Sequence, residues 1–194
     1  MSNKRQIVLG ITGASGAIYA ERYIRGCAKL QDISLSVILT DTARNIWLRE
    51  LEYDPEELIS ECGASLLSNE NFDAPFCSGS AAADTLLVLP CSMGALARIA
   101  GGLASDAISR IADVQLKERR QLIVVPRETP LSLIHIHNMK LLTHAGAIIC
   151  PASPSFYHNP TTIEDLADSF AGRLLHMSGV RPLEKKYQWN NNHE

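Results

Sequence analysis

The sequence predicts an α/β fold with an open, doubly wound parallel sheet and helices on both of its faces. Short apolar runs recur along the chain, as expected of parallel strands that are covered on both sides. Helical patterns separate these runs, as right-handed crossovers between parallel strands require. With 194 residues and 46% hydrophobic content, the chain can bury a substantial core, so we expect residues 1–180 to form one domain.

Each expected strand is a short, continuous apolar run. The runs are IVLGIT (7–12), LSVILT (35–40), TLLVLP (85–90), LIVVP (122–126) and AIICP (147–151). The expected helices fill the intervals, at residues 16–30, 42–51, 55–62, 94–101, 105–117, 132–145 and 162–178. Strands and helices therefore alternate from one end of the chain to the other.

Two segments depart from this alternation. Residues 63–84 are rich in Gly, Ser, Asn and Ala, which predicts a long loop on the ligand-binding face rather than a core element. Residues 181–194 are polar with two aromatic side chains, so we expect a tail that is either frayed or docked on a neighbouring subunit.

Charge and composition exclude several classes of protein. The 18 basic and 21 acidic residues leave a net charge of −3, which indicates neither nucleic acid nor an anionic membrane as a partner. The first apolar run breaks at Gly10, Thr12 and Gly13 and is too short for a signal peptide or a membrane span. Five widely spaced cysteines without a C-x-x-C pair predict no disulfide framework and no zinc site, and they favour the reducing cytoplasm.

Polar and glycine-rich segments follow all five predicted strands. Ligands of such sheets bind at the carboxyl ends of the strands, and a helix N-terminus there favours a phosphate. Ser15, Thr40 and Ser92 add hydroxyl groups to these turns. Gly, Ser and Pro are also the ordinary residues of strand-to-helix turns. Five such turns at one edge nevertheless predict a ligand site; the segments are TGASGA (12–17), TDTA (40–43), PCSMGA (90–95), PRETP (126–130) and PASPSFYH (151–158).

A dinucleotide is one ligand that these segments suggest. Gly13 and Gly16 begin a G-x-x-G pattern, and Asp41 follows the second strand, where an acid that binds ribose is expected. Tyr19 stands where the third glycine of that fingerprint would be. The chain also contains no Tyr-x-x-x-Lys and no G-x-x-x-x-G-K-[ST] segment, so the dinucleotide pattern is incomplete.

Cationic side chains near the predicted site point to an anionic ligand. Arg127 follows a buried strand and is flanked by Pro126 and Pro130, so we expect it to meet an anion, with Glu128 orienting it or handling a proton. Arg110 and Lys117, seven residues apart on one helix, are predicted to face the same way, and Arg173 lies on the last helix. Taken singly, each of these three is more often a solvated surface charge.

Four segments, in this order and spacing, resemble the flavin prenyltransferase family (UbiX type). They are TGASGA, PCSMGALA, RIADVQLKERRQLIVVPRETPLSLIHIHNM and GAIICPASPSFYHNP, and the resemblance covers residues 5–178. It implies a flavodoxin-like fold that binds FMN and transfers a dimethylallyl group from dimethylallyl monophosphate to N5 and C6 of reduced FMN. It also implies no metal, and a homododecamer in which trimer contacts complete each site. The product, prenylated FMN, would serve UbiD-type decarboxylases, including one in ubiquinone synthesis.

The resemblance also assigns roles to residues. The positions that match FMN contacts are Gly13, Ala14, Ser15, Thr40, Ser92, Met93, Gly94, Ala95 and Arg127. Those that match the dimethylallyl phosphate site are Tyr157 and Arg173, with Arg110 and Lys117 in the same cationic neighbourhood and Phe72 as an aromatic wall. The expected catalytic residues are Ser15, Glu50, Lys117, Glu128 and Tyr157. The chain departs from the family at Phe72, where a tryptophan is common, and at Thr40, where a serine is common.

Two other functions stay open at this point. A flavin-dependent decarboxylase of the phosphopantothenoylcysteine type would want a catalytic histidine after the first helix and an asparagine-bearing clamp, and neither motif is seen. A non-enzymatic FMN module of the flavodoxin type would give no reason for Lys117, Tyr157 and Arg173. Of the other reactive side chains, His135 is expected to pack or cap a helix, and Cys91 to be a small buried thiol.

Overall fold

The fold is described from a computed structural model, which places residues 4–180. The predicted tail, residues 181–194, lies outside the described residues. The strands are β1 (Arg5–Ile11), β2 (Ile33–Leu39), β3 (Ser65–Leu67), β4 (Thr85–Cys91), β5 (Gln121–Pro126) and β6 (Ile148–Ile149). The helices are α1 (Ala17–Ala28), α2 (Asp41–Leu51), α3 (Pro55–Glu61), α4 (Met93–Ala100), α5 (Ala107–Lys117), α6 (Leu133–Ala145) and α7 (Ile163–Met177). All five predicted strands and all seven predicted helices are therefore confirmed.

The six strands form one parallel sheet in the order β3-β2-β1-β4-β5-β6. Without the short edge strand β3, this order is that of the flavodoxin-like fold, and with β3 it matches the dinucleotide-binding order. Strand β1 pairs with β2 on one side and with β4 on the other. The chain therefore reverses its winding direction between β1 and β4, which is where such sheets bind ligands.

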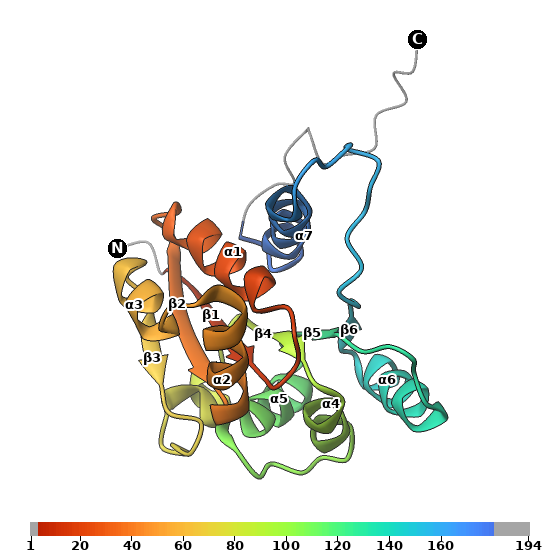
Figure 1. The fold of residues 1–194 in the computed structure, drawn as a ribbon. Helices are drawn as coiled ribbons and strands as arrows, with labels where there is room; N and C mark the ends of the chain where they lie inside the picture. Colours follow the sequence, from red (N-terminus) through yellow and green to blue (C-terminus); the bar gives the residue numbers. More distant parts are fainter. Residues whose placement is uncertain (1–3, 181–194) are drawn as a thin grey trace.

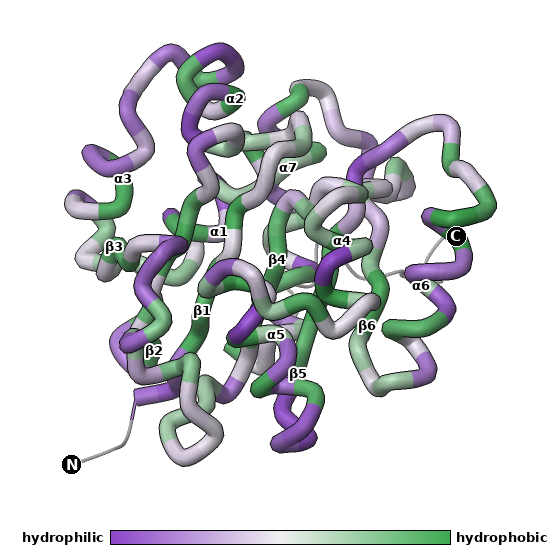
Figure 2. The backbone as a smooth tube through the Cα atoms, turned by 90° about the horizontal axis from the view of Figure 1, so that it is seen from below, coloured by the Kyte–Doolittle hydropathy of each residue, from purple (hydrophilic) through white to green (hydrophobic). Residues whose placement is uncertain are grey.

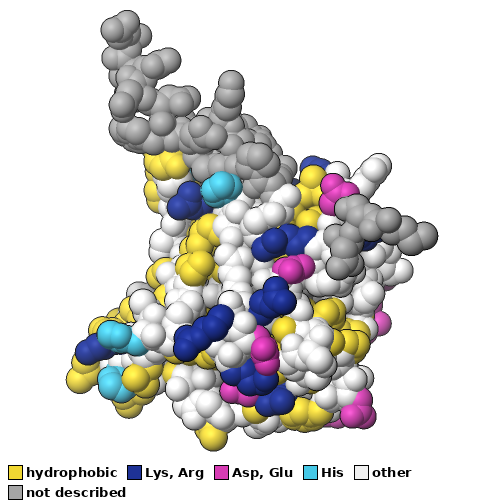
Figure 3. All heavy atoms as spheres, turned by 180° about the vertical axis from the view of Figure 1, so that it is seen from behind, with side chains coloured by type: hydrophobic (Ala, Val, Ile, Leu, Met, Phe, Trp, Pro, Cys, Tyr) yellow, Lys and Arg dark blue, Asp and Glu magenta, His cyan; other side chains and the backbone are white. Residues whose placement is uncertain are grey.

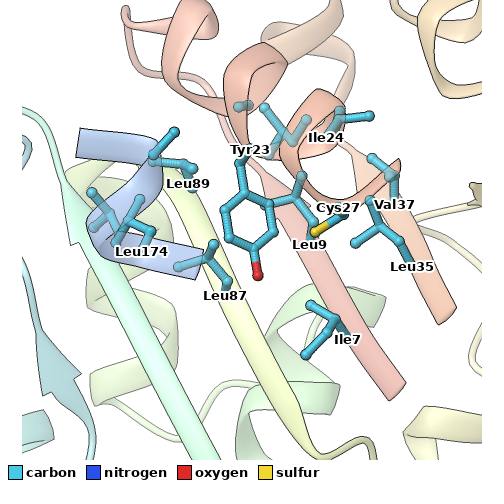
Figure 4. Packing of buried hydrophobic residues seen from close by; sticks show 14 of the residues in the cluster. Ile7, Leu9, Tyr23, Ile24, Cys27, Leu35, Val37, Leu87, Leu89 and Leu174 are labelled. Carbon is cyan, nitrogen blue, oxygen red and sulfur yellow. The ribbon is translucent and has the colours of Figure 1, made fainter. Parts of the chain in front are cut away.

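Helices cover both faces of the sheet, as predicted (Figure 1). Side chains of α1, α2, α3 and α7 share one core cluster with the sheet, and those of α4, α5 and α6 share the other. Figure 2 shows the strands as mostly hydrophobic segments in the middle of the molecule. In Figure 4, the fully buried Tyr23 of α1 lies among Leu9, Leu87 and Leu174. Each such leucine stabilises the fold by about 2 kcal/mol relative to an exposed one.

The segment 63–84 differs from its prediction as a long loop. It contains β3 and two short 3-10 helices, Pro75–Cys77 and Gly79–Ala81. Ala74, Cys77 and Ala83 are buried in the core cluster that α4, α5 and α6 share. Small side chains let this backbone pack closely on the sheet, and elements of three residues are too short to show a periodic pattern.

His135 lies in the first turn of α6, where it caps the helix. The Ser132 backbone N–H donates to its Nδ1 at 3.3 Å, and the His135 N–H donates to the Ser132 hydroxyl at 3.2 Å. The capping expectation for His135 is therefore confirmed. Among the described residues, no helix is both long and apolar enough to cross a membrane.

Candidate active site

The turns after β1 and β4 meet at the point where the winding of the sheet reverses. The buried Thr12 hydroxyl donates to the Pro90 carbonyl at 3.0 Å and accepts from the Ser92 N–H at 2.7 Å. Thr12 therefore ties the two segments that carry most of the predicted cofactor contacts. Thr12 was not among the predicted site residues, although a hydroxyl directly after an apolar strand was a usable signal.

The first loop, residues 13–16, is held from both sides by charged side chains. Arg127 Nε donates to the Ser15 carbonyl at 2.9 Å. The Glu50 carboxylate accepts from the N–H groups of Gly16 at 2.9 Å and Ala17 at 2.8 Å. The structure thus brings three predicted site residues together from three separate segments of the chain: Ser15, Glu50 and Arg127.

This arrangement corrects one expectation about phosphate binding. Helix N-termini at the predicted turns were expected to favour a phosphate, and α1 begins at the first of these turns. The Glu50 carboxylate already occupies this position, where a negative charge is favoured by the helix dipole. A phosphate group therefore has to find its donors elsewhere in the site.

Gly13 is required by close packing against α2. A Cβ built on Gly13 would lie 2.6 Å from Cγ2 of Thr42 and 2.9 Å from its Cβ. We expect Gly13→Ala to displace the first loop and to weaken FMN binding by about tenfold or more, since such overpacking typically costs 1–3 kcal/mol. Flavin fluorescence titration measures this change. Adding Thr42→Ala, which removes the nearest methyl group, should recover part of the affinity; an unchanged affinity in Gly13→Ala alone contradicts the packing argument.

Thr40 and Ser92 cap the helices that follow β2 and β4. The Thr40 hydroxyl accepts from the Ala43 N–H at 3.1 Å, and the Ser92 hydroxyl accepts from the Ala95 N–H at 3.3 Å. Each cap stabilises its helix by about 1 kcal/mol. Because both hydroxyls act as acceptors here, their own protons are left for donation to a ligand.

The first turn of α4 fits the flavin mononucleotide that the resemblance implies. The hydrogen bonds within the described part of the chain leave the backbone N–H groups of Met93 and Gly94 available as donors. Gly94 is exposed, and a Cβ built there would meet only Arg98, at 3.9 Å. FMN carries phosphate and carbonyl oxygens that accept such hydrogen bonds, so the residues at this turn suit it.

A cavity of about 480 Å³ opens beside Thr40, at the carboxyl ends of β2 and β3. Its walls include Leu39, Asp41 and Arg44. Arg44 also pairs with Asp54 at 3.1 Å and with Glu56, so carboxylates neutralise its charge. Asp41 lies at the end of β2, as predicted, but this cavity adds no unpaired cation that would favour a phosphate.

Arg173 and Tyr157, the predicted phosphate-binding pair, come from the last third of the chain. Arg173 is exposed on α7. Burial raises the pKa of the Cys150 thiol, and the charge of Arg173 opposes that rise. Arg173 therefore lies near Cys150, which directly follows β6. Tyr157 is 47% exposed, and its ring meets the edge of His158 at 6.0 Å. It lies in the long connection from β6 to α7, which Figure 1 shows leaving the sheet.

Lys117 and Arg110 do not join this cluster within one chain. Lys117 ends α5 and pairs with Glu118, just before β5 begins at Gln121, so it lies at the opposite edge of the sheet from the ligand-binding turns. Arg110 donates to the Cys77 carbonyl at 3.1 Å and pairs with Asp113 at 2.8 Å. The prediction that both cations share one neighbourhood with Arg173 is not met by the geometry of a single chain.

Phe72 and Glu128, the remaining predicted site residues, are both exposed. Phe72 lies between β3 and the 3-10 helix that packs with α5, whereas α7 covers the other face of the sheet. Glu128 follows Arg127 and accepts from the Thr129 N–H at 2.9 Å. Glu128 is therefore near the first loop, and Phe72 is separated from Arg173 by the sheet.

Cys91 is a buried thiol, as predicted. It is fully inaccessible, and burial raises its pKa to about 12. At about pH 8 the reactive thiolate is therefore scarce, and we expect iodoacetamide to alkylate the half-buried Cys62 well before Cys91. Peptide mass spectrometry follows the order of labelling, with urea-unfolded protein as the control in which all five cysteines react. Early labelling of Cys91 in the folded protein contradicts this description.

Comparison with known proteins agrees with the site. The family described as Flavoprotein matches residues 1–175. The flavin prenyltransferase UbiX of Methanothermobacter thermautotrophicus is 42% identical over 179 residues, which cover 91% of each chain. A crystal structure of AnUbiX (PadA1) in complex with FMN and dimethylallyl pyrophosphate is 37% identical, with a TM-score of 0.88 over 97% of this chain and 99% of the other. A dodecameric FMN-dependent UbiX-like decarboxylase from Escherichia coli O157:H7 is 31% identical, with a TM-score of 0.90 over 96% and 100%. The chain therefore belongs to the flavoprotein family and, within it, to the flavin prenyltransferases of the UbiX type.

Proposed function

We propose that this protein transfers a dimethylallyl group from dimethylallyl monophosphate to N5 and C6 of reduced FMN. The observation that carries the proposal is the meeting of Ser15, Glu50 and Arg127 at the reversal point of the sheet, beside the turn that Ser92 begins. These residues match the FMN site of the family to which the chain belongs. A non-enzymatic FMN module would give no reason for Lys117, Tyr157 and the second cationic group, Arg173.

The flavin is held by the turns after β1, β2, β4 and β5. Met93 and Gly94 donate through their backbone, and Thr40 and Ser92 through their hydroxyls. Arg127, fixed by the Ser15 carbonyl, binds the flavin from the fourth turn. Reduced FMN supplies the two atoms, N5 and C6, that accept the allyl group. Because these hydrogen-bond donors are already fixed before the flavin binds, little additional conformational entropy is lost when N5 and C6 are positioned.

The allylic phosphate is bound by Arg173 and protonated by Tyr157. A monophosphate is a poor leaving group unless cations and a proton donor stabilise the charge that develops on it. Arg173 supplies a fixed positive charge, and Tyr157 supplies a phenolic proton. Both are exposed in the single chain, so the phosphate reaches them from solvent.

Glu50 and Glu128 flank the first loop and are assigned proton handling at the flavin edge. The Glu50 carboxylate is fixed by the Gly16 and Ala17 N–H groups, which hold one oxygen in place. Glu128 is exposed and follows the arginine that holds Ser15. Either carboxylate is thus positioned to accept the proton that C6 loses as the ring closes, while the allyl double bond to which C6 adds takes up a proton in exchange.

Lys117 and Phe72 reach the site from neighbouring copies of the chain. Both lie apart from the first loop in one chain, at the opposite edge or on the other face of the sheet. Helix α6 supports a symmetric assembly, because its first two residues are large apolar side chains that are exposed in the single chain. The exposed fraction is 81% for Leu133 and 70% for Ile134. Figure 3 shows hydrophobic and histidine side chains together at the lower left of the molecule. An apolar patch of this kind is typical of a subunit contact, and we propose a homododecamer.

Prenylated FMN made here would leave for UbiD-type decarboxylases, including one that acts in ubiquinone synthesis. All five cysteines are free thiols in the structure, which suits work in the reducing cytoplasm. These assignments follow from the family rather than from any contact in this chain.

Mass spectrometry of the flavin tests the proposed reaction. The protein is incubated without oxygen with reduced FMN and dimethylallyl monophosphate, and the flavin is then extracted. We expect a flavin heavier by one dimethylallyl unit, in amounts that exceed the enzyme. Unmodified FMN after complete incubation contradicts the proposal. Release of carbon dioxide from phosphopantothenoylcysteine would instead favour the decarboxylase alternative.

A further inference from the structure

Tyr19, in the first turn of α1, packs between the first loop and helix α7. A Cβ built on Gly16 would lie 3.0 Å from Cδ2 of Tyr19, so the tyrosine ring lies directly beside the loop. On its other side the ring meets Phe170 of α7 edge-on, with centroids 5.1 Å apart and planes at 65°. Edge-to-face pairs of this geometry are favourable beyond their burial. Tyr19 also stands where a dinucleotide-binding loop would have its third glycine.

Phe170 connects this contact to the phosphate-binding end of the site. It is only 5% exposed and lies three residues before Arg173, one turn earlier along α7. Helices α1 and α7 pack closely elsewhere too: a Cβ built on Gly26 would lie 2.5 Å from Cδ1 of Leu175. The position of α7, and with it that of Arg173, is therefore set by its packing on α1.

Arg127 lies within electrostatic reach of the same tyrosine. Its charge lowers the pKa of the Tyr19 phenol, against the larger rise that burial causes. Arg127 in turn holds the Ser15 carbonyl. Tyr19 thus neighbours the first loop and Arg127, which holds that loop, on one side and the helix that carries Arg173 on the other.

We propose that Tyr19 is a positioning residue whose ring sets the distance between the flavin loop and Arg173. This inference rests on the proposed function. The ring, rather than the hydroxyl, carries the role, because ring atoms of Tyr19 face Gly16 and Phe170. Shortening this spacer lets α7 approach or tilt, which moves the phosphate of the allyl donor relative to flavin N5. A small displacement of reacting groups lowers the rate strongly.

The test compares Tyr19→Leu with Tyr19→Phe and with a matched control, Tyr53→Leu. Tyr53 also belongs to an edge-to-face pair, with Trp47 at 6.0 Å and 88°, but it follows α2 and contacts neither the first loop nor α7 through that pair. Tyr19→Leu should lower kcat and raise KM for dimethylallyl phosphate, each by about tenfold, with the Kd for FMN within about threefold of wild type. Tyr19→Phe should keep all three values, and Tyr53→Leu should lower only the melting temperature.

Several outcomes overturn the inference. Wild-type kinetics in Tyr19→Leu, or equal kinetic losses in Tyr19→Leu and Tyr53→Leu, reduce the ring to a general packing role. Loss of FMN binding in the Tyr19→Leu variant would show that the ring belongs to the flavin-binding site instead. If Tyr19→Leu does not fold, Phe170→Leu removes the other half of the pair and must show the same split between KM and FMN affinity.

The failure of the proposed function is distinguishable from the failure of this inference. If the wild-type protein binds FMN but forms no prenylated flavin, the proposed reaction fails. Calorimetric titration of the FMN-loaded protein with dimethylallyl monophosphate still tests Tyr19 in that case. A weaker affinity in Tyr19→Leu than in Tyr53→Leu then supports the spacer role, and equal affinities overturn it.

Discussion

Replacing Arg173 by alanine is expected to leave FMN bound and to reduce prenyl transfer by about a thousandfold, since removing one fixed charge partner from a reacting oxyanion typically costs this much. The reason is that Arg173 is assigned to the phosphate of the allyl donor, whereas the turns after β1, β2, β4 and β5 hold the flavin. Tyr157→Phe should show the same separation, because it removes the proton donor and keeps the ring. Flavin absorbance measures FMN content, and mass spectrometry of the extracted flavin measures transfer.

A matched control for Arg173 is Arg25→Ala. Arg25 lies in the last turn of α1 and pairs with Glu21 at 2.9 Å, so its removal takes away the same charge at a distance from the ligand-binding turns. Arg25→Ala should keep both FMN and transfer. Full turnover in both Arg173→Ala and Tyr157→Phe would remove these residues from the phosphate site. Loss of FMN from the Arg173→Ala variant would show that Arg173 belongs to the flavin-binding site instead.

Chains with complementary defects are expected to restore each other's activity when they assemble together. Lys117 lies at the edge of the sheet opposite the turn that holds Arg127, so one chain cannot supply both to a single site. Lys117→Ala and Arg127→Ala should each be inactive alone. When the two chains are co-expressed in equal amounts, random assembly should give back about a quarter of wild-type activity, because each site then draws the two residues independently from different chains.

The control for complementation is a pair of defects within one loop. Glu50 and Arg127 both hold the first loop of the same chain, so mixing Glu50→Ala with Arg127→Ala should restore nothing. Mixed assemblies are verified by mass spectrometry of differently tagged chains. If verified mixtures of Lys117→Ala and Arg127→Ala also stay inactive, Lys117 does not reach a neighbouring site. If Lys117→Ala is active alone, it has no role in transfer.

The sheet was predictable because strands buried on both faces leave a continuous apolar signal. The runs 7–12, 35–40 and 122–126 have that signal, and each matches its strand closely. Strand β3 has no such signal, because it is three residues long and two of the three residues are exposed. The turns after the strands were predictable for a related reason: a parallel sheet brings the carboxyl ends of its strands to one edge whatever the helices between them do.

The contacts within the site were less predictable, because they depend on spatial neighbours that no spacing reveals. Glu50 and Gly16 are 34 residues apart, and Arg127 and Ser15 are 112 apart. The family resemblance assigned Ser15, Glu50 and Arg127 to one site without giving their contacts. The capping of α1 by Glu50 was therefore missed, and a phosphate was expected in its place. Lys117 was also misplaced by its spacing. The seven-residue spacing between Arg110 and Lys117 predicts that both lie on one face of a helix, but it does not predict which subunit's site that face contacts.

The most direct test of this account is a crystal structure of the assembled protein with FMN and dimethylallyl monophosphate bound together. We predict the flavin between the Gly13 to Gly16 loop and the turn that Ser92 begins, with the allyl group against N5 and its phosphate on Arg173 and Tyr157. A second copy should extend its Lys117 to the same phosphate. Two ligands in separate cavities, or a phosphate held at the N-terminus of α1 in place of Glu50, would contradict it.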